Sequence, residues 1–116
     1  MSSVSRFEDL LFWIKAKSLT LSLYNSFTGC RDYGFKDQIL RASVSIMNNI
    51  AEGFEKGSNK DFKKFLFIAK GSSAEVRSML YLAYELKYIS GDNFNHNLDQ
   101  SLEISKMLSG FIKKLY

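Results

Sequence analysis

Residues 35–55 read FKDQILRASVSIMNNIAEGFE, a stretch without proline whose apolar residues recur at helical spacing. At about 100° of rotation per residue, these apolar side chains fall on two adjoining sides of one helix. One side carries Phe35, Ile39, Ala42, Ile46, Ile50 and Phe54, and the other carries Leu40, Val44, Met47 and Ala51. The arc covers about 200°, whereas a surface helix of a bundle needs little more than about 100°. We therefore expect a helix with more apolar surface than one bundle core covers.

Three further helices are expected around this one. The 116-residue chain has no proline, which helix interiors tolerate least, and its turn signals are Gly29, Gly34, Gly57 and Gly91. Ser58 with Asp61 forms a weak capping box, and Asp92 is a natural N-cap. The expected helices span 7–28, 35–55, 59–88 and 93–115. Because the connections are short, the sequence predicts an all-α fold, an antiparallel up-down-up-down four-helix bundle, as a single domain over 1–116.

The cysteine content and hydropathy indicate the compartment. Cys30 is the only cysteine, so no intramolecular disulfide can form, and a reducing compartment fits best. The first residues lack the apolar core of a signal peptide, and no run of about 18 apolar residues could span a bilayer. We expect a cytoplasmic protein that has no membrane partner.

Most enzyme classes are excluded by the residues that they require. A carboxylate-bridged di-iron bundle needs paired Glu-x-x-His motifs, but His96 is the only histidine and no glutamate lies three residues before it. No nucleophile elbow, phosphate-binding glycine loop, dinucleotide fingerprint or zinc spacing occurs. We expect no enzyme, no cofactor and no metal, with His96 in solvent and Cys30 incidental.

The basic residues are concentrated in one segment. The chain carries 16 Lys and Arg against 12 Asp and Glu, and residues 56–70 hold five lysines against Asp61, so the other residues balance. A row of Phe67, Ala74 and Tyr81 runs beside the lysines, and basic residues beside exposed aromatics are typical of nucleic-acid surfaces. The predicted nucleic-acid-binding residues are Lys56, Lys60, Lys63, Lys64, Lys70 and Arg77. The alternative is a solvated lysine face with Phe67 and Tyr81 in a subunit contact.

A polar strip follows the helix expected at 35–55. Its members recur at helical spacing and are Gln38, Arg41, Ser45, Asn49 and Glu52. Arg41 and Glu52 would lie about 16 Å apart on one helix, so each needs a partner elsewhere. We expect Glu75 to pair with Arg41, giving a partly buried polar seam in which loss of one partner costs about 2 to 4 kcal/mol. A solvated strip is the alternative.

These residues also resemble a known family. Residues 38–53 resemble the Q-I-x-R-A-x-x-S-I-x-x-N-I-A-E-G signature of the four-helix-bundle proteins encoded in 23S ribosomal RNA intervening sequences. The match continues through Phe7-Glu8-Asp9-Leu10, Trp13, Ala16 and Tyr24, and through Phe62, Phe65, Leu66, Ala69, Gly71, Ser72 and Glu75. Many relatives have proline where this chain has Met47, so we expect a straighter helix here.

The resemblance implies an assembly and a function class. It implies a ring, typically a homopentamer, in a bacterial cytoplasm. A similar bundle is the accessory subunit of diversity-generating retroelements, where it works beside a reverse transcriptase. The surplus apolar arc of 35–55 and the second row of the helix expected at 59–88, Phe67, Ala74 and Tyr81, independently predict a cyclic homo-oligomer. Two function classes therefore stay open: an oligomer that binds RNA or DNA, and a scaffold or accessory subunit that contacts a reverse transcriptase or another protein.

Overall fold

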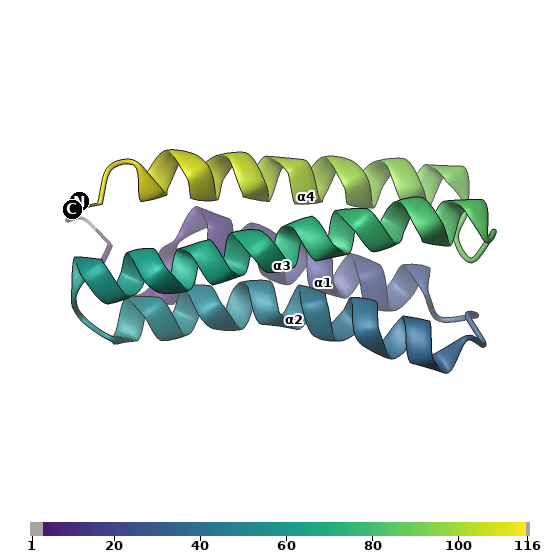
Figure 1. Ribbon diagram of the computed structural model, residues 1–116, viewed down its shortest axis with the longest axis horizontal. Coiled ribbons are helices and arrows are strands. Elements are labelled where there is room, and N and C mark those ends of the chain that lie inside the picture. Colours follow the sequence, from purple (N-terminus) through teal and green to yellow (C-terminus); the bar gives the residue numbers. More distant parts are fainter. Residues whose placement is uncertain (1–3, 116) are drawn as a thin grey trace.

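Four antiparallel helices make up almost the whole chain (Figure 1). The computed structural model describes residues 4–115. A 3₁₀ turn, η1, covers Phe7–Asp9, and the helices are α1 (Leu11–Ser26), α2 (Tyr33–Glu55), α3 (Asn59–Glu85) and α4 (Gly91–Ile112). The bundle measures 43 × 21 × 19 Å. The predicted all-α four-helix bundle is confirmed, and among residues 4–115 no helix has the length and apolarity to cross a membrane.

Side-chain caps set where three of the helices begin. Asp32 accepts a hydrogen bond from the backbone N–H of Phe35, and Ser58 accepts one from that of Asp61, as the predicted capping box requires. The cap of α4 differs from the prediction: Ser90, not Asp92, accepts from the N–H of Asn93 at 3.1 Å. Asp92 instead lies in the first helical turn, where its charge favours the positive end of the helix dipole.

The helices pack as a square, in which each helix contacts two neighbours and α1 lies diagonally opposite α3. In Figure 1, α3 lies toward the viewer and α1 lies behind it. The helices α2 and α3 approach each other closely at Gly53, where a Cβ would lie only 2.6 Å from the Cβ of Phe65. Glycine is therefore required at this position for α2 and α3 to pack at this distance.

Of the two surplus apolar surfaces that the sequence predicts, the row on α3 is exposed but the arc of α2 is not. Apart from Tyr33, which is 70% exposed at the start of the helix, every apolar side chain of α2 is buried or half-buried, because this helix packs against η1, α1 and α3 and uses both sides of its arc. The unpartnered apolar surface lies on α1, which exposes Leu11, Ile14 and Leu21. It also lies on α3, which exposes Phe67, Ile68, Tyr81 and Leu82.

Candidate functional site

A serine-rich contact fixes how α3 and α4 lie along each other. The Ser73 hydroxyl donates to the backbone oxygen of Ser101 at 3.1 Å, and the Ser105 hydroxyl donates to Ser73 at 3.2 Å. Arg77 donates from Nη1 to Ser105 Oγ at 2.7 Å. Because the helices are antiparallel and rise about 1.5 Å per residue, three residues back along α3 from Ser73 and three forward along α4 from Ser101 bring Lys70 level with Ile104. The same register brings the start of α3 level with the end of α4, where the Phe62 and Phe111 rings meet with centroids 5.6 Å apart.

This register gathers lysines from two helices at one end of the bundle, which we call the basic end. On α3 it holds Lys60, Lys63 and Lys64 with Asp61, and on α4 it holds Lys113 and Lys114; Lys70 and Lys106 lie at its inner border, close to the level of Glu103. The start of α3 and the end of α4 lie together at the left of Figure 1. Edge-to-face contacts of Phe111 with Phe12 and Phe62 fix α1, α3 and α4 there.

The α4 lysines escaped the sequence prediction because they are far along the chain from residues 56–70. Antiparallel pairing of the third and fourth helices would have been enough to place them there. Among residues 4–115, no ion pair involves any lysine of the basic end or Lys56. The Lys56 ammonium lies 5.7 Å from the ring centroid of Phe65, and Lys63 and Lys70 are half-buried.

The opposite end of the same helix pair is acidic. From Gly91 to Ser105, α4 carries Asp92, Asp99 and Glu103 and no lysine or arginine, and α3 ends at Glu85. The α3–α4 pair therefore has opposite charge at its two ends. Such a distribution concentrates positive potential in one place even though the whole chain carries only +4.

Two other predicted parts of the nucleic-acid surface have different surroundings. Arg77 is half-buried, and its bond to Ser105 makes it a link between helices. Phe67 and Tyr81 are exposed on α3, at 52% and 53%, and the Tyr81 ring contacts the edge of Phe94 with centroids 5.6 Å apart. The exposed aromatic row that the sequence predicts is therefore present, but Arg77 is not part of an open basic surface.

The predicted polar seam divides into a packed middle and exposed ends. The Ser45 and Ser72 hydroxyls share a 2.9 Å hydrogen bond between α2 and α3, and Asn49 Nδ2 donates to Ser45 O at 2.8 Å. Ser45 and Asn49 are half-buried, whereas Gln38, Arg41, Glu52 and Glu75 are exposed.

The predicted pairing of Arg41 with Glu75 is wrong. Arg41 Nε donates to Asp37 Oδ2 at 2.8 Å, one turn away on its own helix, and Gln38 Nε2 donates to Glu75 Oε2 at 3.3 Å. A carboxylate at i−4 reaches an exposed guanidinium without crossing between helices. Only the Ser45–Asn49 part of the seam is therefore half-buried as expected.

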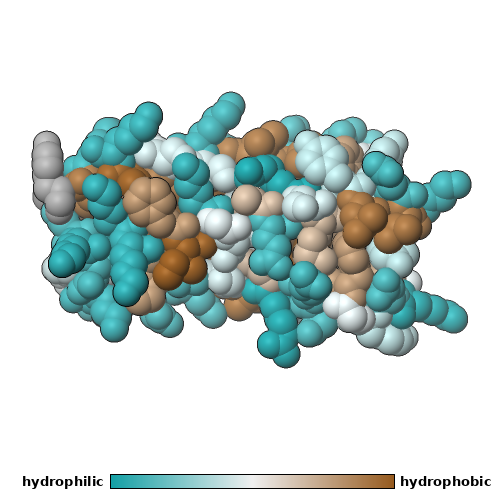
Figure 2. Space-filling view, in the orientation of Figure 1, coloured by the Kyte–Doolittle hydropathy of each residue, from teal (hydrophilic) through white to brown (hydrophobic). Residues whose placement is uncertain are grey.

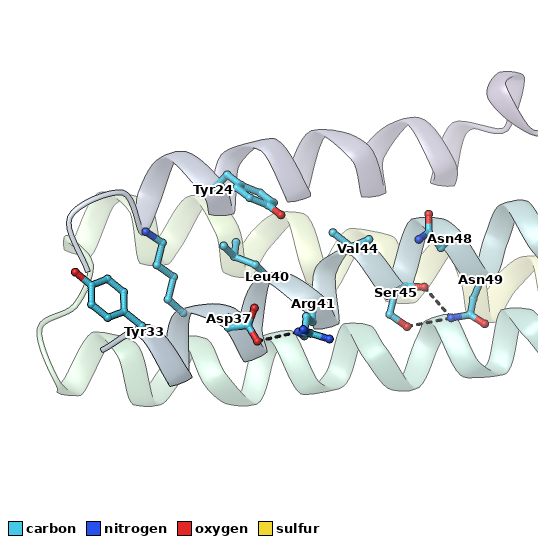
Figure 3. A pocket seen from close by; sticks show the side chains of 10 residues that line it. Tyr24, Tyr33, Asp37, Leu40, Arg41, Val44, Ser45, Asn48 and Asn49 are labelled. Atoms are coloured by element: carbon cyan, nitrogen blue, oxygen red, sulfur yellow. Dashed lines mark hydrogen bonds and ion pairs between the residues drawn. The ribbon is translucent and has the colours of Figure 1, made fainter. Parts of the chain in front are cut away.

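A shallow groove of about 850 Å³ runs along the outer side of α2 (Figure 3). Tyr24 of α1 points toward Leu40 and Val44 of α2, while Arg41 lies on the other edge with Asp37. Within residues 4–115, no three His, Cys, Asp or Glu side chains are placed to share a metal ion. This groove offers side-chain contacts without an evident catalytic group.

Sequence reasoning missed a buried amide next to the only histidine. Asn97 is fully buried; its Oδ1 accepts from the Ser22 hydroxyl at 2.7 Å and its Nδ2 donates to Ser26 Oγ at 3.0 Å. His96 is exposed. The signal was present, since position 97 is in helical phase with the core positions Ser101, Ile104 and Leu108.

Comparisons with known proteins agree with this fold. The family model described as "23S rRNA-intervening sequence protein" matches residues 8–110. The chain is similar to the 1.70 Å crystal structure of a protein of unknown function from the S23 ribosomal protein family of Bacteroides thetaiotaomicron, with a TM-score of 0.84 and 27% identity over 89% of this chain and 99% of that one. No curated protein matches significantly. The resemblance seen in the sequence is confirmed, and the chain belongs to the family of 23S rRNA-intervening sequence proteins.

Proposed function

We propose that this protein is a non-enzymatic homo-oligomeric bundle that binds the phosphate backbone of RNA or DNA through its basic end. The observation that carries the proposal is the gathering of lysines from α3 and α4 at that end, with no ion pair to them among residues 4–115. Lysines that are not held by carboxylates are available to replace the counterions of a polyanion. The exposed rings of Phe67 and Tyr81 lie farther along α3.

The lysine-rich composition supports binding without sequence readout. Base reading in a groove relies largely on arginine, asparagine or glutamine placed against base edges, and the chain has only four arginines. Of these, Arg6, Arg41 and Arg77 are bonded to other residues of the same chain. Contacts at the basic end would therefore recognise the backbone and carry little sequence information.

Oligomerisation would raise the affinity of a weak single site. One copy presents few phosphate contacts, whereas a ring presents the basic end of every subunit on one rim. Once one subunit has bound, the others are held close to the same polyanion, which raises the overall affinity. Five subunits are what the family resemblance implies. Location in a bacterial cytoplasm is likewise part of this proposal.

The test is a titration of the protein with single-stranded RNA, single-stranded DNA and duplex DNA at low salt, followed by fluorescence anisotropy. Reversal of Lys60, Lys64 and Lys113 to glutamate should abolish binding. The matched control reverses Arg31, Lys36 and Lys87, which changes the net charge equally but away from the basic end. Equal losses in both variants, or no binding by the parent, would contradict the proposal.

A scaffold or accessory subunit with no nucleic-acid contact is the second candidate. The exposed apolar side chains of α1 and α3 favour it, because apolar areas of this kind mark protein contacts more often than nucleic-acid contacts. Capture of a reverse transcriptase or another protein by a parent that binds no nucleic acid would support this candidate.

A further inference from the structure

The outward side of α1 carries a row of uncharged residues, which we call the α1 row. Its members alternate in steps of three and four, are all exposed, and are Leu11, Ile14, Ser18, Leu21 and Asn25. Leu21 is 63% exposed and Leu11 is 57% exposed. This spacing lines residues along one face for two heptads, as in helices that pack against a partner helix. The core face of α1 is already buried in its own bundle, so this helix is apolar on two opposite sides.

The outward side of α3 carries a second uncharged row of the same length, which we call the α3 row. Its members are also exposed at steps of four and three, and are Phe67, Gly71, Ala74, Ser78 and Tyr81. Both rows run for about 21 Å. In the α3 row large rings stand at the two ends and small residues lie between them. Figure 2 shows the face that α3 crosses, where brown apolar side chains are exposed among pale and teal ones.

Gly71 has no packing role inside its own chain. A Cβ built there meets no atom within 4 Å, in contrast to Gly53, where it meets Phe65 at 2.6 Å. Glycine in the middle of a helix costs about 0.5 to 1 kcal/mol relative to alanine. Gly71 is therefore unfavourable for the isolated bundle and gives it no contact in return. A helix of another molecule approaching α3 closely would give this glycine a role.

The two rows are arranged to meet each other on different copies of the chain. They lie on diagonally opposite helices and face away from each other, so one copy cannot join them. A contact between two different faces of the same protein is heterologous. It generates a closed ring when the rotation from each copy to the next returns to the first copy. On α1 the exposed charged residue is Lys17, whereas Lys15 is half-buried and paired with Glu103 of its own chain at 3.2 Å. The exposed charges in the C-terminal half of α3, Glu75 and Glu85, are both acidic. One such contact would cover one row of each copy, and a closed ring would cover both rows of every copy.

We propose that the α1 row of one copy packs into the α3 row of the next, with the aliphatic side chains of α1 seated over Gly71, Ala74 and Ser78 between the two rings. This interface rests on the assembly part of the proposed function and names its surfaces. In a ring about an axis along the bundle, α1 of one copy and α3 of the next run in the same direction, so every basic end lies on one rim.

The first test compares two leucine substitutions by light scattering coupled to gel filtration. Gly71→Leu should fold normally, because the space around Gly71 is open, and should run as single chains of 13.3 kDa. Gly110→Leu is the matched control: Gly110 is also an exposed helical glycine with no atom within 4 Å of its Cβ position, but it lies on α4, outside both rows. It should assemble like the parent.

The second test mixes two variants that each keep one intact face. Leu21→Glu should disrupt the α1 row and give single chains, while Leu102→Glu, at an exposed leucine of α4, should not. When Leu21→Glu and Gly71→Leu proteins are mixed, the intact α3 row of the first meets the intact α1 row of the second. One interface then forms without closing a ring, so the mixture should contain complexes of twice the 13.3 kDa chain mass.

Several outcomes would overturn the interface: a parent of 13.3 kDa, assembly of Gly71→Leu that matches the parent, or a mixture that stays at single-chain mass. If Leu21→Glu failed to assemble while Gly71→Leu assembled like the parent, two copies would meet through their α1 helices instead. These masses do not depend on nucleic acid. A parent that assembles through both rows but binds no RNA or DNA would leave the interface standing and refute the proposed function.

Discussion

At the scale of single residues, Gly53 shows how closely α2 and α3 pack. A methyl group there would lie 2.6 Å from the Phe65 Cβ and 3.1 Å from a ring carbon of Phe62, so the helices must separate to admit it. Gly53→Ala should lower the free energy of unfolding by about 1 to 3 kcal/mol, as overpacked cores do. Gly110→Ala should instead raise it by about 0.5 to 1 kcal/mol. Urea denaturation that gave both changes the same sign would contradict this assignment.

Neighbouring residues at the start of α4 provide a second comparison. Asn97 is buried and bonded to Ser22 and Ser26, so Asn97→Ala leaves these hydroxyls without their partner and should cost about 1 to 3 kcal/mol. His96→Ala, one position earlier and exposed, should change stability by less than about 0.5 kcal/mol. Thermal melts of the two variants test the difference, and equal melting temperatures would argue against the buried amide.

A hydrogen bond between the loops at one end of the bundle makes stability depend on pH. Tyr88 Oη donates to Asp32 Oδ2 at 2.7 Å; this bond lowers the pKa of Asp32 below its ordinary 3.8 and raises the pKa of Tyr88 above its ordinary 10.0. The lowered pKa of Asp32 contributes stability that is fully present above pH 3.8 and is lost as the pH falls through the pKa of the folded state. The raised pKa of Tyr88 contributes stability that is fully present below pH 10.0 and is lost as the pH rises through the pKa of the folded state.

The melting temperature of the parent should therefore exceed that of Tyr88→Phe by a constant amount between about pH 5 and pH 9, and by less at either extreme. Removal of the phenol oxygen removes both contributions. Tyr84→Phe is the control, since that ring is stacked on Phe94 and has no hydroxyl bond within residues 4–115. If the difference in melting temperature between the parent and Tyr88→Phe changed steadily across neutral pH, the Tyr88–Asp32 hydrogen bond would not be its cause.

Residue-level prediction from the sequence worked where the partner is local. Ser58 and Asp61 are three residues apart, and the predicted Ser58 cap is present because one turn of helix brings the two residues together. Arg41 was matched to Glu75 across helices on charge alone, although Asp37 was four residues away. Polar networks between helices depend on rotation and register, which the residue pattern alone does not give.

At the scale of elements, Arg77 links α3 and α4 and has a structural role. Arg77→Ala removes the bond to Ser105 and should lower the free energy of unfolding by about 1 kcal/mol. Affinity for nucleic acid should change little. Lys64→Ala, at an exposed lysine of the basic end, should do the reverse: weaken binding and leave the melting temperature unchanged. Melting curves and anisotropy titrations of both variants test these roles. A loss of affinity in Arg77→Ala, or a loss of stability in Lys64→Ala, would contradict them.

Helix number, order and direction could be predicted because glycine turns and apolar periodicity are local properties of the chain. The outer face of α1 could not be assigned, because residues 7–28 carry two apolar stripes and the sequence does not show which of them faces the core. One stripe includes Leu11, Ile14 and Leu21, and the other includes Phe12, Leu19 and Leu23. On α2 the wide arc suggested an exposed surface, yet both of its sides are covered within the chain by η1, α1 and α3. Which apolar stripe stays exposed depends on how the helices are rotated relative to one another.

At the scale of the whole molecule, charge is separated along the α3–α4 pair, and this separation predicts how binding responds to salt. If four lysines in all meet phosphates of duplex DNA, a fourfold rise in salt should lower the affinity about 100-fold, and contacts from further subunits would make the fall steeper. The logarithm of affinity against that of salt concentration should be linear, and Lys64→Ala should make it less steep. A slope near zero for the parent would mean that phosphate contacts do not drive binding.

The first helix starts and the last helix finishes at the basic end of the bundle (Figure 1). A purification tag or fluorescent protein attached at either terminus would therefore emerge beside the lysines and screen them from a polyanion, and in a ring every such extension would crowd the same rim. Reporters are better inserted between α1 and α2 or between α3 and α4, at the far end of the bundle. Failure of a terminally tagged preparation to retain RNA would be uninformative until the tag had been removed.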